Sequence, residues 1–304
     1  MGLGLPDRLK PGRPQPGAVD GVKLIIISGR SGSGKSTVLH VLEDNGYNCI
    51  DNLPVGLLTA LAANAGPETA NCAVSIDARN LPGDLERFPE ILEDLQQASP
   101  HLAVEVIFLD ADTTTLVRRF SETRRRHPLS RNERTLPEAL QAESILLEGI
   151  ANLADLTIDS SRLSHHELRE LVRARVVAHG SRGPSLLFIS FAFSAGVPVD
   201  ADLVFDVRCL PNPHWIPELR AFTGRDEAVQ RWFDRSEDVE KMFSDIHGFL
   251  DDWLPAYARS NRSYMSVAIG CTGGRHRSVY LAERLKARFA GLDHDVLVRH
   301  RELG

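Results

Sequence analysis

Short apolar runs alternate along the chain with longer segments in which apolar residues recur every three or four positions. The short runs predict strands buried on both faces, and the longer amphipathic segments predict helices. In the first half the predicted strands are 24–27, 47–51, 73–77, 104–110 and 156–159, and the predicted helices are 38–43, 57–63, 88–97, 114–126 and 136–153. This alternation predicts a doubly wound parallel sheet with helices on both faces.

The second half continues the alternation. A helix is predicted over 164–178, and the segment 179–184 (His-Gly-Ser-Arg-Gly-Pro) interrupts it as a linker. The predicted strands that follow are 185–191, 203–207, 265–269 and 295–299, and the predicted helices are 227–233, 239–254 and 279–289. We therefore expect a flexible proline-rich tail at 1–21, an α/β domain at 22–163, a helix and linker at 164–184, and a second α/β domain at 185–304.

The first predicted strand runs directly into Gly29-Arg30-Ser31-Gly32-Ser33-Gly34-Lys35-Ser36, which fits the P-loop pattern G-x-x-x-x-G-K-[ST]. A strand, a glycine loop and a helix follow one another as a phosphate cradle requires. The glycines let backbone N–H groups turn towards phosphate oxygens, and the helix N-terminus adds positive charge. We predict that Lys35 reaches the β- and γ-phosphates and that Ser36 holds Mg²⁺.

Acidic residues end several predicted strands, at the edge where open parallel sheets bind ligands. Asp110 follows the apolar run 106–109 in the manner of a Walker B aspartate, which makes it a candidate for the Mg²⁺ site and for catalysis. Asp51 is a second catalytic candidate, and Asp77 competes with both. A solvated carboxylate at a strand end is the alternative interpretation of each.

Cations crowd the segment that follows Asp110. They are Arg118, Arg119, Arg124, Arg125 and Arg126, and His127-Pro128-Leu129 closes the segment. Arginine forks bind phosphate oxygens in pairs, and small-molecule kinases carry a basic lid of this kind. A solvated helix face balanced by Glu122 and Glu133 would give the same pattern.

A strand, a glycine-containing loop and a helix start recur at 265–289, which predicts a second anion site. The predicted binding groups are Cys271, Thr272, Gly273, Gly274, His276, Arg277 and Ser278, with Arg208, Asn212 and His214 facing the same pocket. The spacing Cys271-x5-Arg277-Ser278 also matches the loop of cysteine phosphatases, in which a thiolate is the nucleophile. Those enzymes usually carry His where this chain has Gly270, and a structural turn is the third interpretation.

Composition limits the classes of function. The net charge of −6 argues against coating nucleic acid by bulk charge but leaves room for a local basic patch. The four cysteines form no C-x-x-C pair, which predicts neither a zinc cluster nor a disulfide framework and suits a reducing cytoplasm. No apolar run approaches the ~20 residues of a membrane helix. With no signal-peptide pattern at the N-terminus, we expect a cytoplasmic protein without membrane contact.

Taken together, these motifs resemble the RapZ/YvcJ family of bacterial nucleotide-binding proteins over about Lys23 to Arg301. In the first half the resemblance is carried by 28–36 (SGRSGSGKS), 49–54 (CIDNLP), 75–80 (SIDARN) and 108–112 (FLDAD). Further carriers are 123–129 (TRRRHPL), 205–208 (FDVR) with 210–215 (LPNPHW), and 268–274 (AIGCTGG). The last three together are specific to this family.

The resemblance implies ATP binding at Gly29 to Ser36, guanine-nucleotide (GTP) binding at Asp77, Ala78, Arg79 and Asn80, and weak ATPase and GTPase activity. It also implies a C-terminal domain that binds an aminosugar phosphate and a small regulatory RNA. Such a protein presents the RNA to an endoribonuclease and so tunes aminosugar synthesis. Family members form homo-oligomers, with tetramers known, and we expect the same of this chain.

The end of this chain departs from members that have the RNA role, which carry a tail rich in Lys and Arg. Here Arg299 and Arg301 are diluted by Glu302. Because phosphate contacts dominate RNA affinity, we expect Arg299 and Arg301 to support weaker RNA binding with a shallower salt dependence.

Two other functions fit the same residues. A true small-molecule kinase would use the P-loop, Asp51 as base and the segment 124–126 as lid. A cysteine phosphatase would use Cys271 as its nucleophile.

Overall fold

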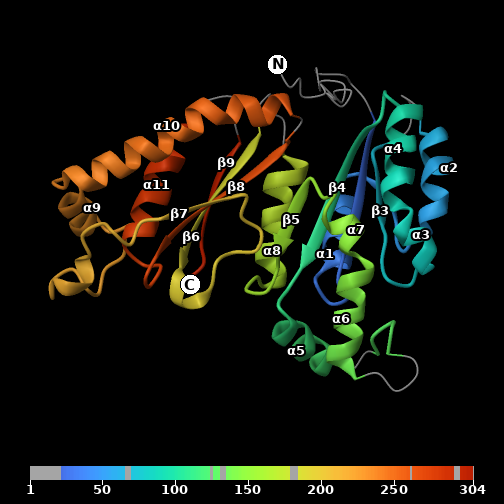
Figure 1. Cartoon of the computed structure of the whole chain (residues 1–304), viewed down its shortest axis with the longest axis horizontal. Coiled ribbons are helices and arrows are strands. Elements are labelled where there is room, and N and C mark those ends of the chain that lie inside the picture. Colours follow the sequence, from blue (N-terminus) through green and yellow to red (C-terminus); the bar gives the residue numbers. More distant parts are fainter. Residues whose placement is uncertain are drawn as a thin grey trace, which may run out of the picture.

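Two parallel α/β units make up the molecule (Figure 1). The computed structural model describes residues 22–65, 70–123, 126–130, 135–178, 184–260, 262–290 and 295–303. The first sheet has the strand order β2-β3-β1-β4-β5 and the second has the order β7-β8-β6-β9. Every strand pairing in both sheets is parallel. The predicted α/β class, with a doubly wound first sheet and a second α/β domain, is confirmed.

The first unit alternates strands with helices. Its strands are β1 (Lys23–Gly29), β2 (Asn48–Ile50), β3 (Cys72–Ser75), β4 (Ala103–Asp110) and β5 (Leu156–Asp159). Its helices are α1 (Lys35–Asp44), α2 (Leu58–Ala63), α3 (Pro82–Glu86), α4 (Phe88–Ala98), α5 (Thr113–Thr123), α6 (Leu136–Leu146), α7 (Glu148–Ala151) and α8 (His165–Val172).

Alternate residues of the central strand face two helical layers. In β1, Leu24 and Ile26 lie in the core formed with α2, α4 and α7, whereas Ile25 and Ile27 pack against α1 and α8. All four side chains are almost fully buried. Burial on both faces explains why the strand is marked by a continuous apolar run rather than by alternation.

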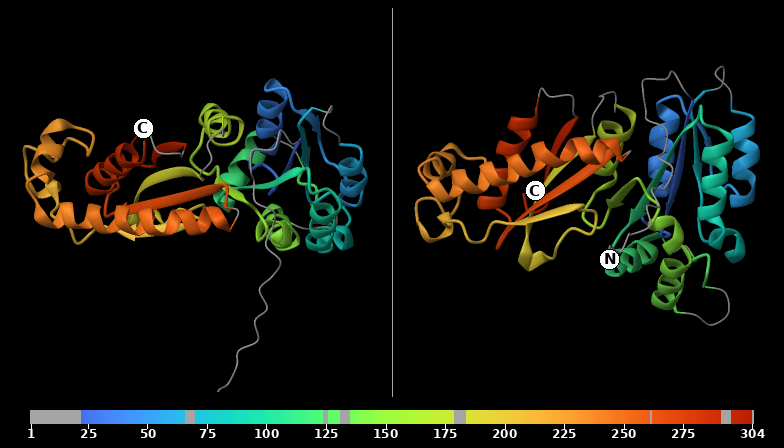
Figure 2. Two further views of the ribbon diagram at one scale, coloured as in Figure 1. Left: turned by 90° about the horizontal axis from the view of Figure 1, so that it is seen from above. Right: turned by 45° about the horizontal axis from the view of Figure 1, so that its top comes forward.

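The second unit contains β6 (Ser185–Ala192), β7 (Leu203–Asp206), α9 (Glu227–Phe233), α10 (Glu237–Arg259), β8 (Tyr264–Cys271), α11 (Arg277–Phe289) and β9 (Val296–His300). The long helix α10 runs along one side of this unit, as both views of Figure 2 show. Phe188 and Ile269 point into the core formed with α10 and α11. On the opposite face of the sheet, Ile189 and Ala268 form a smaller cluster with Leu171 of α8.

Some helices differ from their predicted extents. The helix predicted over 136–153 is two helices, because Leu147 between α6 and α7 adopts a non-helical backbone and is fully buried against the first sheet. The helix predicted over 164–178 consists of α8 and one turn of π-helix, Arg173–Val177. Helix α3 was not predicted. The predicted tail at 1–21 and residues 179–183 of the predicted linker lie outside the described residues.

Helix α8 lies between the two sheets (Figure 1). Its side chains Leu168 and Val172 pack on the first sheet, and Leu171 packs on the second. A single helix therefore contributes to the cores of both units, so their relative placement depends on apolar packing as well as on the chain connection.

The π-helical turn after α8 places a buried arginine inside the second unit. The Arg175 guanidinium donates hydrogen bonds to Ser266 Oγ at 3.1 Å and to the carbonyl oxygens of Ser185 and Met265 at 3.3 and 3.4 Å. Burial lowers the pKa of Arg175 to about 10. Nearby, the Tyr264 hydroxyl donates to Glu105 Oε2 on β4 at 2.8 Å. Because the buried Arg175 guanidinium donates to hydroxyl and carbonyl acceptors from residues 185, 265 and 266, removing any of them would leave part of its charge without a partner.

Charged residues at the end of the chain complete the contact between the units. Arg301 lies 3.9 Å from Asp159, which ends β5, and Arg299 lies 3.6 Å from Asp200. Both arginine side chains are mostly buried, with 7% and 17% of their surface exposed. Arg301 therefore pairs with the first unit, and Glu302 beside it pairs with Arg162 of that unit at 2.8 Å, whereas the Arg299–Asp200 pair lies within the second unit.

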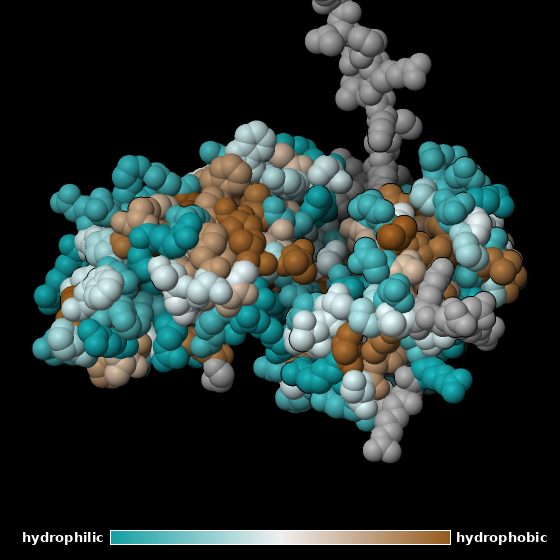
Figure 3. Space-filling model, turned by 60° about the horizontal axis from the view of Figure 1, so that its bottom comes forward, coloured by the Kyte–Doolittle hydropathy of each residue, from teal (hydrophilic) through white to brown (hydrophobic). Residues whose placement is uncertain are grey.

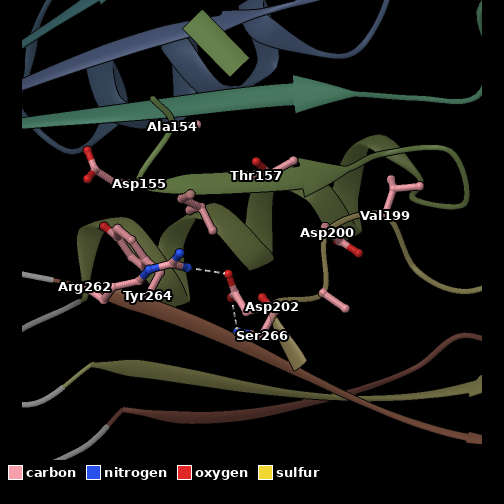
Figure 4. A pocket seen from close by; sticks show the side chains of 11 residues that line it. Ala154, Asp155, Thr157, Val199, Asp200, Asp202, Arg262, Tyr264 and Ser266 are labelled. Carbon is pink, nitrogen blue, oxygen red and sulfur yellow. Dashed lines mark hydrogen bonds and ion pairs between the residues drawn. The ribbon is translucent and has the colours of Figure 1, made fainter. Parts of the chain in front are cut away.

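A small cavity of about 90 Å³ lies between β5 and the start of β8 (Figure 4). Its lining includes the carboxylates of Asp155, Asp200 and Asp202. Asp202 accepts hydrogen bonds from Arg262 at 2.6 Å and from the Ser266 amide at 2.7 Å. The contact between the units is thus polar on this side and apolar around α8.

Apolar side chains also reach the surface of the second unit (Figure 3). Val204 of the edge strand β7 is 44% exposed, and Phe249 and Trp253 of α10 are 38% and 53% exposed. Phe249 packs edge-on against Phe205. Exposed apolar residues beside a sheet edge are typical of surfaces that another chain covers. Within the part of the chain that the structure describes, no helix is long and apolar enough to cross a membrane.

We predict that Gly29→Ala lowers the free energy of unfolding by roughly 3 kcal/mol or more. A Cβ atom at Gly29 would lie 2.0 Å from the Leu109 carbonyl oxygen of β4, and the φ of +142° is unfavourable for any L side chain. Urea unfolding measures the effect. Gly149→Ala in α7 is the control, because its Cβ would meet open space. Equal stabilities of the two variants would contradict this explanation.

We predict that Arg301→Gln lowers the free energy of unfolding by about 2 kcal/mol, because it leaves the buried Asp159 carboxylate without its cation. Arg231→Gln, which removes an exposed ion pair with Glu227, is the matched control and should change stability by less than about 0.5 kcal/mol. Thermal or urea unfolding of both variants provides the comparison. A loss no larger than that of the control would show that the buried pair does not stabilise the fold.

Candidate functional site

The segment 29–36 connects β1 to α1 in a conformation that only glycine adopts readily. Gly29, Gly32 and Gly34 all have positive φ, at 142°, 87° and 110°. Helix α1 then begins at Lys35, with Gly34 preceding its first turn. The strand, loop and helix therefore have the order and backbone that a phosphate cradle needs.

Lys35 occupies the centre of this site. Its ammonium group donates to the carbonyl oxygens of Gly29 at 2.6 Å and Arg30 at 3.3 Å. Burial lowers the pKa of Lys35, and the negative charges of Glu143, Asp77 and Asp51 oppose that shift. The site thus places one cation among three carboxylates that come from different parts of the chain.

Asp110 ends β4 beside the loop, as predicted for a Walker B residue. One of its oxygens accepts hydrogen bonds from Arg30 Nε at 2.6 Å and from the Ala111 amide at 2.7 Å. Arg30 also donates to the Ala111 carbonyl. Asp110 therefore fixes the second residue of the P-loop.

The protein groups near the loop fit a Mg²⁺ ion that shares its ligands with a nucleotide. Ser36 presents an exposed hydroxyl at the start of α1, and Asp110 ends the adjacent strand. Mg²⁺ typically takes one or two protein oxygens and completes its shell with phosphates and water. In the described ranges, no group of three His, Cys, Asp or Glu residues could hold a metal by itself. Ser36 and Asp110 would hold the ion, which neutralises phosphate charge when bound.

The other two acids have structural partners. Asp51 is exposed and accepts a 2.5 Å hydrogen bond from Ser75 Oγ. Asp77 is buried, which by itself raises the pKa of its carboxyl, but hydrogen bonds from Arg79 (2.5 Å for the shortest) outweigh burial and lower it. Both acids contribute negative charge near Lys35.

The predicted guanine-binding segment 77–80 braces a neighbouring loop. Ala78 is buried, and Asn80 Oδ1 accepts from the Val55 amide at 2.8 Å. The Asn80 amide group in turn lies 3.4 Å from the Leu53 carbonyl. Asn80 thus fastens the loop that follows β2 to the loop that follows β3, and guanine recognition here stays a prediction.

A buried acid that the sequence did not single out lies against the P-loop. Glu143 of α6 accepts from the Ser31 amide at 2.9 Å and from Ser31 Oγ at 2.7 Å. It also pairs with His127 Nε2 at 2.9 Å, and both side chains are fully buried. Burial alone raises the pKa of Glu143, but the hydrogen bonds from His127 and Ser31 and the charge of Lys35 outweigh it, so the pKa is lowered.

The sequence carried one signal for this acid. Glu143 lies three residues after Leu140 and four after Ala139 on the buried stripe of α6, and both of these apolar residues are fully buried. An acidic residue at a core position of an amphipathic helix needs a buried partner. The sequence could therefore have marked Glu143 as unusual, but it could not have identified Ser31 and His127 as its partners.

The basic segment contributes in part to the P-loop. Arg119 donates to the carbonyl oxygens of Gly32 at 3.0 Å and Ser160 at 2.7 Å, and Ser160 Oγ donates to the Ser33 carbonyl at 2.7 Å. Arg118 makes an exposed pair with Glu122, and Arg126 is exposed. Arg124 and Arg125 lie outside the described residues. Arg119 is thus a brace of the loop backbone in this conformation.

The second predicted anion site joins β8 to α11. Cys271 and Ser278 are buried, and their Sγ and Oγ atoms lie 3.2 Å apart. Arg277 is also buried and donates to the carbonyl oxygens of Arg208 at 2.7 Å and Leu210 at 3.1 Å. The arginine predicted to hold phosphate therefore joins two loops, and phosphatase chemistry at the buried Cys271 stays a prediction.

The exposed rim of this second loop is formed by other residues. Thr272, Gly273 and Arg275 face solvent, whereas Gly274 and His276 are buried. Arg208 lies 4.0 Å above the Phe193 ring and is exposed. Asn212 Oδ1 accepts from the His214 amide, and the neighbouring Trp215 is 75% exposed. The rim thus combines cations, small loop residues and an exposed indole.

Arg299 and Arg301 have acidic partners in the structure, and their predicted role in RNA binding stays a prediction. We expected them to offer charge to RNA phosphates, but both are mostly buried and pair with Asp200 and Asp159. Arg301 pairs with an acid of the first unit, and Arg299 pairs with an acid of its own unit. RNA binding through these two residues finds no support in this conformation.

The chain was compared with known proteins. Residues 22–180 match the RapZ-like N-terminal domain, and residues 184–304 match the RapZ C-terminal domain. A nucleotide-binding protein of Pseudomonas fluorescens (strain Pf0-1) is 56% identical over 286 residues, covering 93% of this chain and 100% of that protein. A nucleotide-binding protein from the ptsN-ptsO intergenic region of Stutzerimonas stutzeri is 54% identical with the same coverage of each chain.

Solved structures give weaker likenesses. A sugar kinase from Janibacter sp. HTCC2649 is 18% identical and covers 50% of this chain and 92% of its own, with a TM-score of 0.33. The YorR protein of Bacillus subtilis, in complex with phosphorylated GDP, is 19% identical and covers 49% and 92%, with a TM-score of 0.34. Scores this low carry no argument. The domain matches and the close relatives show that the chain belongs to the RapZ family.

Proposed function

We propose that this protein is a nucleotide-binding regulator that binds ATP or GTP with Mg²⁺ and hydrolyses it slowly. The observation that carries the proposal is the P-loop, in which three glycines of positive φ lead into a helix that begins at Lys35. Slow hydrolysis is consistent with Asp51 and Asp110, because each already accepts a hydrogen bond from the protein. The close relatives named nucleotide-binding proteins support the same function.

The second unit is proposed to bind an aminosugar phosphate and a small regulatory RNA. Anion contacts on an exposed rim are offered by Arg275, by the Thr272-Gly273 backbone and by Arg208, whose guanidinium also pairs with Asp206 at 2.6 Å. Trp215 offers a flat apolar surface for a base. In this role the protein would act as an RNase adapter, presenting the RNA to an endoribonuclease and so tuning aminosugar synthesis. The exposed apolar residues Val204, Phe249 and Trp253 support a homo-oligomer, and the family resemblance makes a tetramer the expected form. We propose that the protein acts in the cytoplasm.

A small-molecule kinase remains the second candidate. The observation that favours it is the exposed Asp51 carboxylate, which lies at a strand end and contributes charge near Lys35. A kinase would transfer the γ-phosphate to an aminosugar or a nucleoside in a coupled assay, whereas a regulator would release phosphate slowly without an acceptor.

We predict that Lys35→Ala reduces the affinity for ATP and GTP by about 100-fold or more, since the cradle keeps its amides but loses its cation. Calorimetric titration in the presence of Mg²⁺ measures the loss. Lys241→Ala, which removes an exposed lysine paired with Asp245, is the control. Unchanged nucleotide affinity in Lys35→Ala would refute the proposed P-loop function.

We predict that crosslinking in cells recovers a defined small RNA with the wild-type protein, and that Arg208→Ala/Arg275→Ala recovers several-fold less. Both arginines are exposed on the rim of the second loop, so their loss removes phosphate contacts without opening the core. Arg231→Ala/Lys241→Ala is the control with the same change in net charge. Recovery of no defined RNA with the wild-type protein, together with turnover of a small acceptor, would establish the kinase instead.

A further inference from the structure

The P-loop is occupied at one end by the protein's own carboxylate. Both oxygens of Glu143 are engaged by Ser31, the third residue of the loop, through its amide at 2.9 Å and its hydroxyl at 2.7 Å. The side chain has no exposed surface. Backbone and hydroxyl donors in a P-loop normally face phosphate, so this carboxylate engages donors of the kind that a phosphate oxygen uses.

Glu143 also supplies charge to the lysine of the loop. Among the charged groups that act on Lys35, Glu143 has the largest influence, ahead of Asp77, Arg79 and Asp51. The lysine of a P-loop contacts the β- and γ-phosphates. The Glu143 carboxylate therefore lies within electrostatic reach of the place that the terminal phosphate would take.

A third contact connects the same carboxylate to the basic segment. His127 Nε2 lies 2.9 Å from Glu143 Oε2, and the Leu129 amide donates to His127 Nδ1 at 3.1 Å. That acceptor role leaves Nε2 as the nitrogen that carries the proton and donates to Glu143. The Phe120 ring packs against His127, with centroids 5.3 Å apart. A displacement of Glu143 would therefore disturb the segment 126–130 that follows the predicted lid helix.

We propose that Glu143 is a built-in competitor of the terminal phosphate, and that it sets the preference of the site between nucleoside diphosphates and triphosphates. This inference rests on the proposed nucleotide function. An ionised Glu143 and a γ-phosphate share one cation and repel each other, whereas a diphosphate brings less charge to that end of the loop. Triphosphate binding then requires Glu143 to withdraw from Ser31, which releases His127 and signals the presence of the γ-phosphate to the basic segment.

We predict that Glu143→Gln increases the affinity ratio of a non-hydrolysable ATP analogue to ADP by about tenfold or more. Glutamine keeps the shape and a hydrogen-bond acceptor but removes the charge. Calorimetric titration of both nucleotides with Mg²⁺ measures the ratio without any catalytic turnover. Glu148→Gln, an exposed acid on α7, is the matched control, and Glu143→Asp should keep the wild-type ratio because it keeps the charge.

The outcomes separate the two proposals. If both nucleotides bind and Glu143→Gln leaves the ratio unchanged while lowering stability, Glu143 is a structural brace and the inference is wrong. If wild-type protein binds neither nucleotide, the proposed function fails and the inference fails with it. Should Glu143→Gln not fold, amide exchange of wild-type residues 126–130 and 135–146 provides the test. We expect faster exchange with the triphosphate analogue than with ADP, and equal exchange would overturn the proposal.

Discussion

The central constraint in the first unit is the burial of a lysine ammonium group, Lys35, in the glycine loop. The carboxylates around the P-loop act on this group. Burial lowers the pKa of Lys35, and the carboxylates of Glu143, Asp77 and Asp51 oppose that shift without cancelling it. Each acid comes from a different part of the chain and is fixed by its own partner: Ser31 and His127 for Glu143, Arg79 for Asp77, and Ser75 for Asp51. The loops at this sheet edge thus bring three separately fixed carboxylates within electrostatic reach of one lysine.

Side chains from other parts of the chain hold the P-loop backbone in shape. Arg119 and Ser160 bind its carbonyl oxygens, and Arg30 binds Asp110 at the end of β4. Ser160 follows Asp159, the acid that pairs with Arg301 from the end of the chain. Next to Arg301, Glu302 pairs with Arg162 at 2.8 Å. The Glu302 carboxylate also lies close to Gly274 of the second loop, because a Cβ added at Gly274 would lie 2.5 Å from Glu302 Oε2. A continuous path of contacts thus joins the two predicted anion sites.

Much of this organisation could be predicted from the sequence, because local signals encode it. The continuous apolar run before Gly29, the glycine spacing and the following helix identify the P-loop and its parallel strand without any tertiary information. The same alternation and a second glycine loop predict the second unit, and the resemblance to the RapZ family adds the ligands expected there. The break at Leu147 was not predicted, because an unbroken amphipathic pattern runs through a residue that the core draws out of the helix.

What could not be predicted depends on contacts between distant residues. Glu143 and Ser31 are 112 positions apart in the sequence, and Arg301 and Asp159 are also more than 100 positions apart. Local residue spacing therefore cannot reveal either pairing. From the sequence alone, Arg299 and Arg301 are expected to be exposed because they lie at the end of the chain. The fold buries them by placing β9 beside β6. The loop pattern predicts Arg277 as a phosphate ligand, whereas in the structure its guanidinium donates to the carbonyl oxygens of Arg208 and Leu210.

The measurement that tests the central claim most directly is an experimental structure of the full chain with Mg²⁺ and a non-hydrolysable ATP analogue. We expect the terminal phosphate beside the Lys35 ammonium group and the Glu143 carboxylate withdrawn from the Ser31 amide and hydroxyl. A structure with the phosphates away from Lys35, or with the terminal phosphate in place and both Glu143–Ser31 hydrogen bonds intact, would contradict the claim.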